Sequence, residues 1–231
     1  MADHDDRIAR LLPHMPQAVV FDMDGLLLDT ETLYRQAHQF ASAALGYPIS
    51  DALHGTLIGV PRDQTEVRLA EAFGPAFDLR SYDARFQTEF ARLCEGGIPL
   101  RPGVHALLDA LDCHRLPHAV ATSTGRALAT RHLQEAGILH RFAAVVTRDD
   151  VTCAKLHPET FLTAASRLQI QPGACLALED SHNGIRAASA AGMMTVMVPN
   201  LLPPTDEISA LYVGIRTSLD ELIRDIDDAA G

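Results

Sequence analysis

Basic residues are scarce in this sequence and gather in no block. The 231-residue chain has 19 Lys and Arg against 30 Asp and Glu, a formal net charge of -11. Non-specific nucleic-acid binding depends on basic patches, so we expect no nucleic-acid partner. If the chain binds an anionic ligand, it must concentrate its few cations at the site. Isolated Lys and Arg residues are therefore informative.

Long apolar runs and paired cysteines are also missing. No stretch reaches the roughly 18 apolar residues of a membrane span, so we expect no membrane partner. The first ten residues are polar and acidic and lack the basic-then-apolar order of a signal peptide. The four cysteines are scattered and form no CxxC pair. We therefore expect reduced thiols and a cytoplasmic protein.

What the sequence does contain is a series of short apolar runs, each followed by a polar turn. Such runs are typical of buried parallel strands. They cover residues 18–21, 119–121, 143–146, 175–178 and 194–198. Helical segments separate them at 104–111, 127–136, 158–168 and 183–191, and a closing helix is expected at 218–229. This alternation predicts an α/β fold, a Rossmann-like three-layer core around a parallel sheet.

The stretch from about residue 30 to residue 99 interrupts the alternation. Residues 33–45, 62–73 and 82–94 have helical periodicity, and no buried strand is evident among them. We therefore expect a core formed by residues 1–30 and 100–231. An all-helical cap domain, residues 31–99, would be inserted into it.

The first polar turn contains Asp22 and Asp24, followed by Gly25. Phosphoryl transfer needs an in-line nucleophile, a proton donor for the leaving oxygen and positive charge around the equatorial oxygens. Asp22 is a candidate nucleophile that would form an acyl-phosphate. Asp24 would protonate the leaving group and then deprotonate water. The alternative is that Asp-x-Asp-Gly is only a turn after a strand.

Three further clusters follow later strands. The hydroxyls and exposed N–H groups of residues 122–125 suit a phosphate oxygen, with Thr122 and Ser123 as the candidates, although helix N-capping is the commoner role of such residues. Lys155 would hold both the nucleophile and the phosphate, or is an ordinary surface charge. Glu179 and Asp180 would complete an oxygen-rich Mg²⁺ site with Asp22, unless Asp180 only caps a helix.

Each alternative is plausible for one cluster and much less so for all of them together. The carboxyl ends of parallel strands meet at one edge of the sheet, where sites of such folds lie. The clusters supply a nucleophile, an acid, hydroxyls, a lysine and metal-binding carboxylates in order. We therefore expect these groups to lie around one site for a small phosphorylated metabolite.

These motifs resemble those of the haloacid dehalogenase superfamily, in the branch that includes beta-phosphoglucomutase and many small-molecule phosphatases. The resemblance covers roughly residues 18–200 and rests on four stretches, 19–31, 119–123, 154–161 and 178–185. It implies a Mg²⁺-dependent phosphatase that hydrolyses a phosphate monoester through an aspartyl-phosphate. The helical insertion would be the family's cap domain, which closes over the site.

The resemblance also implies a role for each motif residue. Asp22 would be phosphorylated, and Asp24 would act as acid and base while its backbone carbonyl ligates the metal. Phosphate would be bound by Thr122 and Lys155. Asp180 would ligate Mg²⁺, and Glu179 would do so directly or through water.

In the cap, Arg62 and Tyr34 are the candidate substrate contacts, with His54 as a weaker one. Tyr34 appears where the mutases have a His, which favours a phosphatase. A phosphomutase remains an alternative, as does a non-catalytic binding protein of the same fold. We expect a monomer or a small homo-oligomer.

Overall fold

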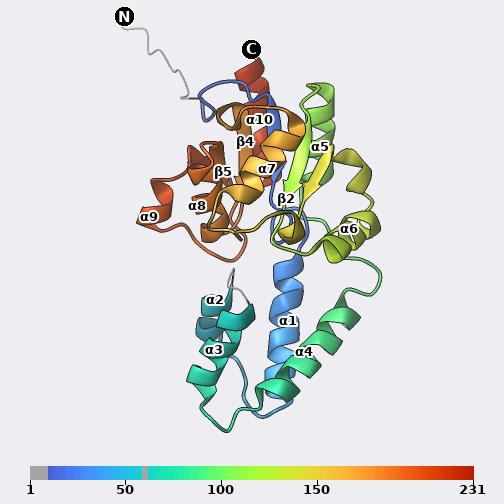
Figure 1. The fold of residues 1–231 in the computed structure, drawn as a ribbon, viewed down its shortest axis with the longest axis vertical. Coiled ribbons are helices and arrows are strands. Elements are labelled where there is room, and N and C mark those ends of the chain that lie inside the picture. Colours follow the sequence, from blue (N-terminus) through green and yellow to red (C-terminus); the bar gives the residue numbers. More distant parts are fainter. Residues whose placement is uncertain (1–9, 59–61) are drawn as a thin grey trace, which may run out of the picture.

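A six-stranded parallel sheet forms the centre of the fold. The structure, a computed structural model, describes residues 10–58 and 62–231. The strands lie in the order β3-β2-β1-β4-β5-β6 (Figure 1). Their bounds are Ala18–Phe21 (β1), His118–Ala121 (β2), Ala144–Val146 (β3), Cys175–Glu179 (β4), Met194–Met197 (β5) and Gly214–Ile215 (β6). The parallel sheet predicted from the sequence is confirmed. Strand β6 has only two residues and was not predicted.

Helices cover both faces of this sheet because successive strand residues point to opposite sides. Val19 and Phe21 belong to the core cluster that includes side chains of α5 and α10. Ala18 and Val20 belong to a second cluster, with side chains of α7 and α8. The bounds of these helices are Val104–Cys113 (α5), Glu159–Leu168 (α7), His182–Ala190 (α8) and Leu219–Ala230 (α10). The core is therefore a three-layer α/β/α structure, as predicted.

The described core also contains shorter or more peripheral elements in addition to these four helices. Two are α-helices, Arg126–Glu135 (α6) and Asp206–Ser209 (α9). Three are single 3₁₀ turns, Leu139–Arg141 (η1), Arg148–Asp150 (η2) and Pro172–Ala174 (η3). In the described part of the chain, no helix is long and apolar enough to cross a membrane.

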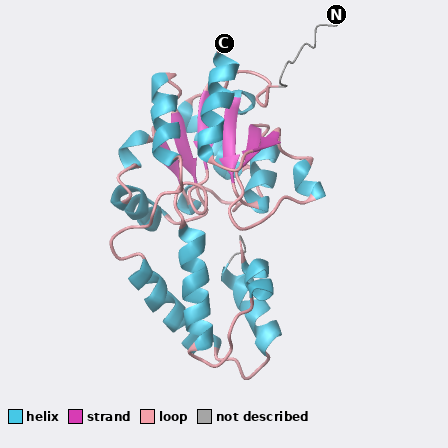
Figure 2. Cartoon of the chain, turned by 180° about the vertical axis from the view of Figure 1, so that it is seen from behind, coloured by secondary structure: helices cyan, strands magenta, loops and turns pink. Residues whose placement is uncertain are grey.

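Four helices lie between β1 and α5 in the chain. They are Thr30–Ala43 (α1), Asp51–Leu57 (α2), Arg62–Phe73 (α3) and Leu79–Leu93 (α4). Helix α2 was not predicted. Figures 1 and 2 show these helices together beyond one end of the sheet, with α1 beside α4. Apart from residues 59–61, which lie outside the described residues, no strand occurs between Thr30 and Leu93. The helical character of this insertion is thus as predicted, and its domain limits at residues 31 and 99 remain a prediction.

The register of the sheet determines where the polar turns meet. Phe21, the last residue of β1, is aligned with Val120 of β2 on one side and Leu178 of β4 on the other. The residues that follow these positions therefore emerge side by side at the carboxyl edge of the sheet. This edge faces the four inserted helices (Figures 1 and 2).

Candidate active site

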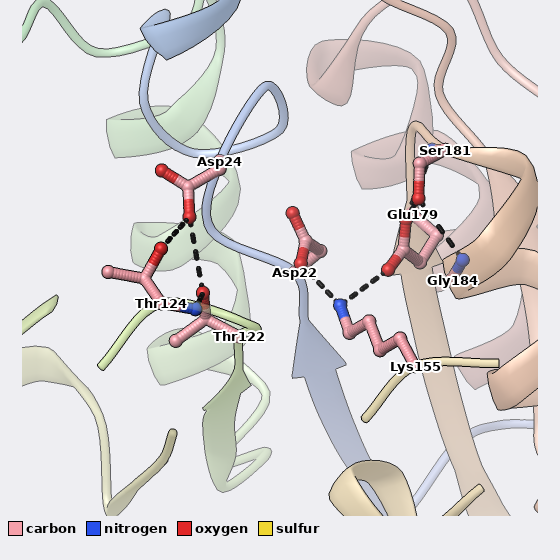
Figure 3. Close-up of polar contacts among 8 residues, drawn as sticks. All are labelled: Asp22, Asp24, Thr122, Thr124, Lys155, Glu179, Ser181 and Gly184. Atoms are coloured by element: carbon pink, nitrogen blue, oxygen red, sulfur yellow. Dashed lines mark hydrogen bonds and ion pairs between the residues drawn. The ribbon is translucent and has the colours of Figure 1, made fainter. Parts of the chain in front are cut away.

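Asp22 lies directly beyond β1, at the centre of the carboxyl edge. Its N–H donates to the Leu178 carbonyl at 3.0 Å, so the ladder with β4 continues up to the acidic residue. The residue is only 6% exposed. Its backbone is thereby fixed, and its carboxylate is directed toward Lys155 (Figure 3).

Lys155 connects the side chains of Asp22 and Glu179. Its Nζ donates to Asp22 Oδ1 in a short ion pair and to Glu179 Oε1 at 2.6 Å (Figure 3). The other carboxylate oxygen of Glu179 accepts from the N–H and the hydroxyl of Ser181, at 3.1 and 3.0 Å. The Lys155 side chain is 6% exposed, and the Lys155–Leu156 peptide bond is cis. The sequence-predicted lysine is therefore a buried member of the acidic site and not a surface charge.

A third acid completes this group. One oxygen from each of Asp22, Glu179 and Asp180 lies within 4.8 Å of the others, and all three residues are buried. Gly25 permits this approach: a Cβ there would lie 2.2 Å from Asp180 Oδ2, and its φ of +85° favours glycine. The first polar turn is thus shaped to bring Asp180 close to the end of β1.

Burial makes negative charge costly at these carboxyls. Desolvation, with repulsion from Glu179 and Asp24, raises the pKa of Asp22 to about 8, against the opposing effect of Lys155. Burial and the neighbouring carboxylates of Asp22 and Glu179 also raise the pKa of Asp180 well above its ordinary range. Burial lowers the pKa of Lys155, but the two carboxylates bonded to it outweigh that effect and raise it.

This donor set suits a divalent cation. Three ionised carboxylates beside one ammonium group carry a net charge of -2, which one divalent ion would balance. Oxygen ligands are those that Mg²⁺ prefers, and a bound cation would hold Asp22 and Asp180 in their ionised forms. The residues present therefore fit the metal that the sequence resemblance implies.

Asp24 occupies the other side of the same turn. Its Oδ2 accepts from Thr124 Oγ1 at 2.7 Å and from Thr122 Oγ1 at 3.2 Å (Figure 3). The Thr122 hydroxyl also accepts from the N–H of Thr124 at 3.0 Å. The predicted phosphate-binding threonine is thus a partner of the predicted acid. Of the two predicted hydroxyl residues, Ser123 lines the cavity described next, whereas Thr122 is buried and is not among its lining residues.

A cavity of about 540 Å³ lies between the acidic turns and the inserted helices. Its core side includes Asp22, Asp24, Lys155 and Asp180. Its other side includes aromatic and imidazole rings of α1, α2 and α4, beside the acidic side chains of Glu31, Glu66 and Asp83. These rings belong to Tyr34, His38, His54, Tyr82 and Phe86. The cavity can therefore hold a phosphate at one end and a larger organic group at the other.

These five rings, which we call the ring wall, pack against one another and against Phe90. Tyr34 stacks on Phe90 with ring centroids 4.4 Å apart, and His38 lies 4.5 Å from Phe86 by the same measure. His38 Nδ1 forms a short hydrogen bond with the Tyr82 hydroxyl. Burial, together with His54, lowers the pKa of His38 to about 4, so His38 is neutral at pH 7.

The cap candidates named from the sequence are placed differently. Tyr34 and His54 both line the cavity. The side chain of Arg62 lies outside the part of the chain that the structure describes, although α3 begins at this residue. His38, Tyr82 and Phe86 were not predicted, because the direction in which they face depends on how α1 packs against α4. Thr124, which follows the two predicted hydroxyl residues and donates to Asp24, was not predicted as a site residue.

Comparisons with known proteins place the chain in a family. The family model described as haloacid dehalogenase-like hydrolase matches residues 16–192. A phosphorylated carbohydrates phosphatase of Thermotoga maritima is 33% identical over 177 residues, 77% of this chain and 82% of that protein. Fructose-1-phosphate phosphatase YqaB of Escherichia coli is 35% identical over 184 residues, 78% of this chain and 95% of that one.

A solved structure shows the same arrangement of elements. CbbY from Rhodobacter sphaeroides, in complex with phosphate, superposes with a TM-score of 0.72 at 27% identity. The match covers 92% of this chain and all of that one. Sequence, fold and site geometry agree, and the chain belongs to the haloacid dehalogenase-like hydrolase family.

Proposed function

We propose that this hydrolase is a Mg²⁺-dependent phosphatase that cleaves a small-molecule phosphate monoester through an aspartyl-phosphate on Asp22. The observation that carries the proposal is the buried group of Asp22, Lys155, Glu179 and Asp180 at the floor of a cavity. It combines an oxygen nucleophile with an ammonium group and a fitting cation site, which phosphoryl transfer requires.

The chemistry divides into two steps. In the first, Asp22 attacks phosphorus, the bond to the ester oxygen breaks, and Asp24 gives its proton to the leaving alkoxide. In the second, Asp24 takes a proton from water, which attacks the aspartyl-phosphate and releases inorganic phosphate. Asp24 lines the cavity, as this role requires.

The positive groups act on the phosphoryl oxygens. Lys155 would hold Asp22 in line and contact the phosphate, with Ser123 and Thr122 at the opposite turn. A divalent ion would be held by Asp22, Asp180 and the backbone carbonyl of Asp24, with Glu179 as a direct or water-mediated ligand. When bound, the ion neutralises the carboxylates and stabilises charge on the phosphoryl group.

We further propose that the inserted helices are a cap that binds the rest of the substrate. Tyr34 and the other rings of the cavity wall suit the face of a sugar or of another cyclic group. The names of the phosphorylated carbohydrates phosphatase and of the fructose-1-phosphate phosphatase support a phosphorylated carbohydrate. Arg62 is proposed as a further contact on its position at the start of α3. The scattered cysteines support a cytoplasmic location.

The direct test is release of inorganic phosphate from a panel of sugar phosphates, nucleotides and short organic phosphates with Mg²⁺. We expect Asp22→Asn to reduce kcat by at least about 10³-fold, because the amide is a poor nucleophile. The exposed Asp206 provides the matched control, and Asp206→Asn is expected to keep wild-type turnover. Excess chelator is expected to abolish activity.

Full turnover by Asp22→Asn would contradict the assignment of Asp22 as the nucleophile. Full turnover in excess chelator would contradict the metal requirement. The same assay separates the phosphatase from a phosphomutase. A mutase would accumulate an isomeric sugar phosphate, whereas the proposed enzyme releases phosphate steadily.

A further inference from the structure

The loop that carries Lys155 contains a second group of metal-ligating side chains. Cys153, His157 and Glu159 each offer one ligand atom, and these atoms all lie within 4.8 Å of one another. They flank Lys155 in the chain, yet they lie on the surface: Cys153 and His157 are exposed and Glu159 is half-buried. None of the three lies in the acidic cluster at Asp22.

The carboxylate of this group is already fixed in place. Its Oε1 accepts from the N–H of Thr152 at 3.0 Å, and its Oε2 from the N–H of Cys153 at 2.8 Å. These bonds tie the first turn of α7 back to the residue that bears the thiol. Each carboxylate oxygen keeps a further lone pair, so Glu159 can accept these bonds and still bind a cation.

The imidazole lies beside the same carboxylate. His157 Nδ1 is 3.9 Å from Glu159 Oε2 and 3.3 Å from the Glu159 nitrogen, whose N–H it accepts. A tetrahedral ion with bonds of about 2.0–2.3 Å separates its ligands by about 3.3–3.8 Å. The 3.9 Å distance and the 4.8 Å limit among the three ligand atoms lie close to this spacing, and Nδ1 would bind the ion in place of the Glu159 N–H.

The ligand types indicate which ion would bind. A thiolate, a neutral imidazole and a carboxylate carry a charge of -2 together, which balances one divalent cation. Thiolate and imidazole are ligands of Zn²⁺ and similar transition metals, whereas Mg²⁺ prefers oxygen. The exposure of the group leaves a coordination position open to water and an entry path for the ion.

We propose that Cys153, His157 and Glu159 form a second metal site, selective for Zn²⁺-like ions, in the loop that carries Lys155. Such an ion would tie residues 153–157 of the loop to Glu159, the first residue of α7. The site is distinct in composition from the acidic cluster, which contains no sulfur. Binding there can therefore be observed independently of phosphatase activity.

Co²⁺ titration of the full chain tests this site, because a thiolate bound to Co²⁺ gives a near-ultraviolet charge-transfer band that oxygen ligands do not. We expect a band that saturates at one equivalent of Co²⁺, bleaches when Zn²⁺ is added and persists in excess Mg²⁺. Cys153→Ser is expected to abolish it, and His157→Ala to weaken Co²⁺ binding by at least about tenfold.

The matched control is Cys113→Ser, which removes another exposed thiol and is expected to keep the band. Circular dichroism of each variant shows whether it is folded. No band in the folded wild-type chain, or a band that survives Cys153→Ser, would overturn the proposal. Loss of phosphatase activity in Asp22→Asn has no bearing on this result, so the two proposals fail separately.

Discussion

At the scale of single residues, the site depends on a lysine shared between two acids. Lys155 Nζ contacts both Asp22 and Glu179 in a buried environment, where unpaired charges would be costly. That these residues meet was predictable from the sequence, because they lie at the ends of strands of one parallel sheet or in the turns that follow them, and these turns share one edge of it. The hydrogen bonds from Thr122 and Thr124 to Asp24 were not predictable, since side-chain pairing across turns depends on the register of the strands.

The proposed role of Asp24 as proton donor leads to a prediction about leaving groups. Asp24→Asn is expected to lower kcat/KM by about 10²–10⁴-fold for an alkyl phosphate, whose alkoxide needs a proton. The loss is expected to be much smaller for p-nitrophenyl phosphate, whose leaving group is stable without one. kcat/KM covers only the steps up to departure of the leaving group, so it isolates this role. An equal loss for both esters would contradict it.

At the scale of elements, helix α8 is positioned against the acid that holds Lys155. A Cβ at Gly184 would lie 1.7 Å from Glu179 Oε1, so only glycine leaves room for the buried carboxylate. The Gly184 N–H also donates to the Ser181 hydroxyl at 3.1 Å (Figure 3). The start of α8 thus packs closely against the end of β4. Helical periodicity in the sequence cannot predict this contact.

Gly184→Ala is therefore expected to displace Glu179. We expect a loss of roughly 1–3 kcal/mol in the free energy of unfolding. We also expect a fall of at least about tenfold in kcat/KM, because the lysine is misplaced. Gly55→Ala is the matched control, since no atom lies within 4 Å of its added Cβ in helix α2. Urea unfolding and phosphate release measure both effects. Equal behaviour of the two variants would show that α8 does not constrain Glu179.

The α1–α4 pair contains a buried histidine whose titration should affect stability. The pKa of His38 falls from its ordinary 6.5 to about 4 in the folded chain, mainly through burial. Between these values the unfolded chain binds the proton more readily, so stability is full above about pH 6.5. It is lost as pH falls toward 4, by at most about 1.4 kcal/mol per pH unit.

His38→Gln removes this contribution. Urea unfolding from about pH 7 to about pH 4.5 is expected to show a variant that is less stable than the wild type at pH 7. The difference in the free energy of unfolding should shrink steadily as the pH falls. Protonation of His38 in the unfolded chain destabilises the wild type, whereas the variant has no titrating group at this position. A difference that stays constant across this range would contradict a buried, neutral His38.

At the scale of the whole molecule, residues from the sheet and from the inserted helices line one cavity, and the proposed function depends on both. The sheet and the helical character of the insertion were predictable, because buried parallel strands need continuous apolar runs and inserted helices interrupt that pattern. The positions of His38, Tyr82 and Phe86 in the ring wall were not predictable, since helical periodicity does not reveal which helix face meets the core. Two-residue β6 and seven-residue α2 were too short to carry a pattern.

The central claim is that phosphate passes through a covalent bond to Asp22. The most direct measurement is rapid quenching during turnover of p-nitrophenyl phosphate, followed by borohydride, which reduces an acyl-phosphate to an alcohol. Mass spectrometry then locates the reduced residue. Our account predicts homoserine at position 22 and nowhere else, and none without substrate. Homoserine at another position, or its absence while p-nitrophenol is released in a burst, would contradict it.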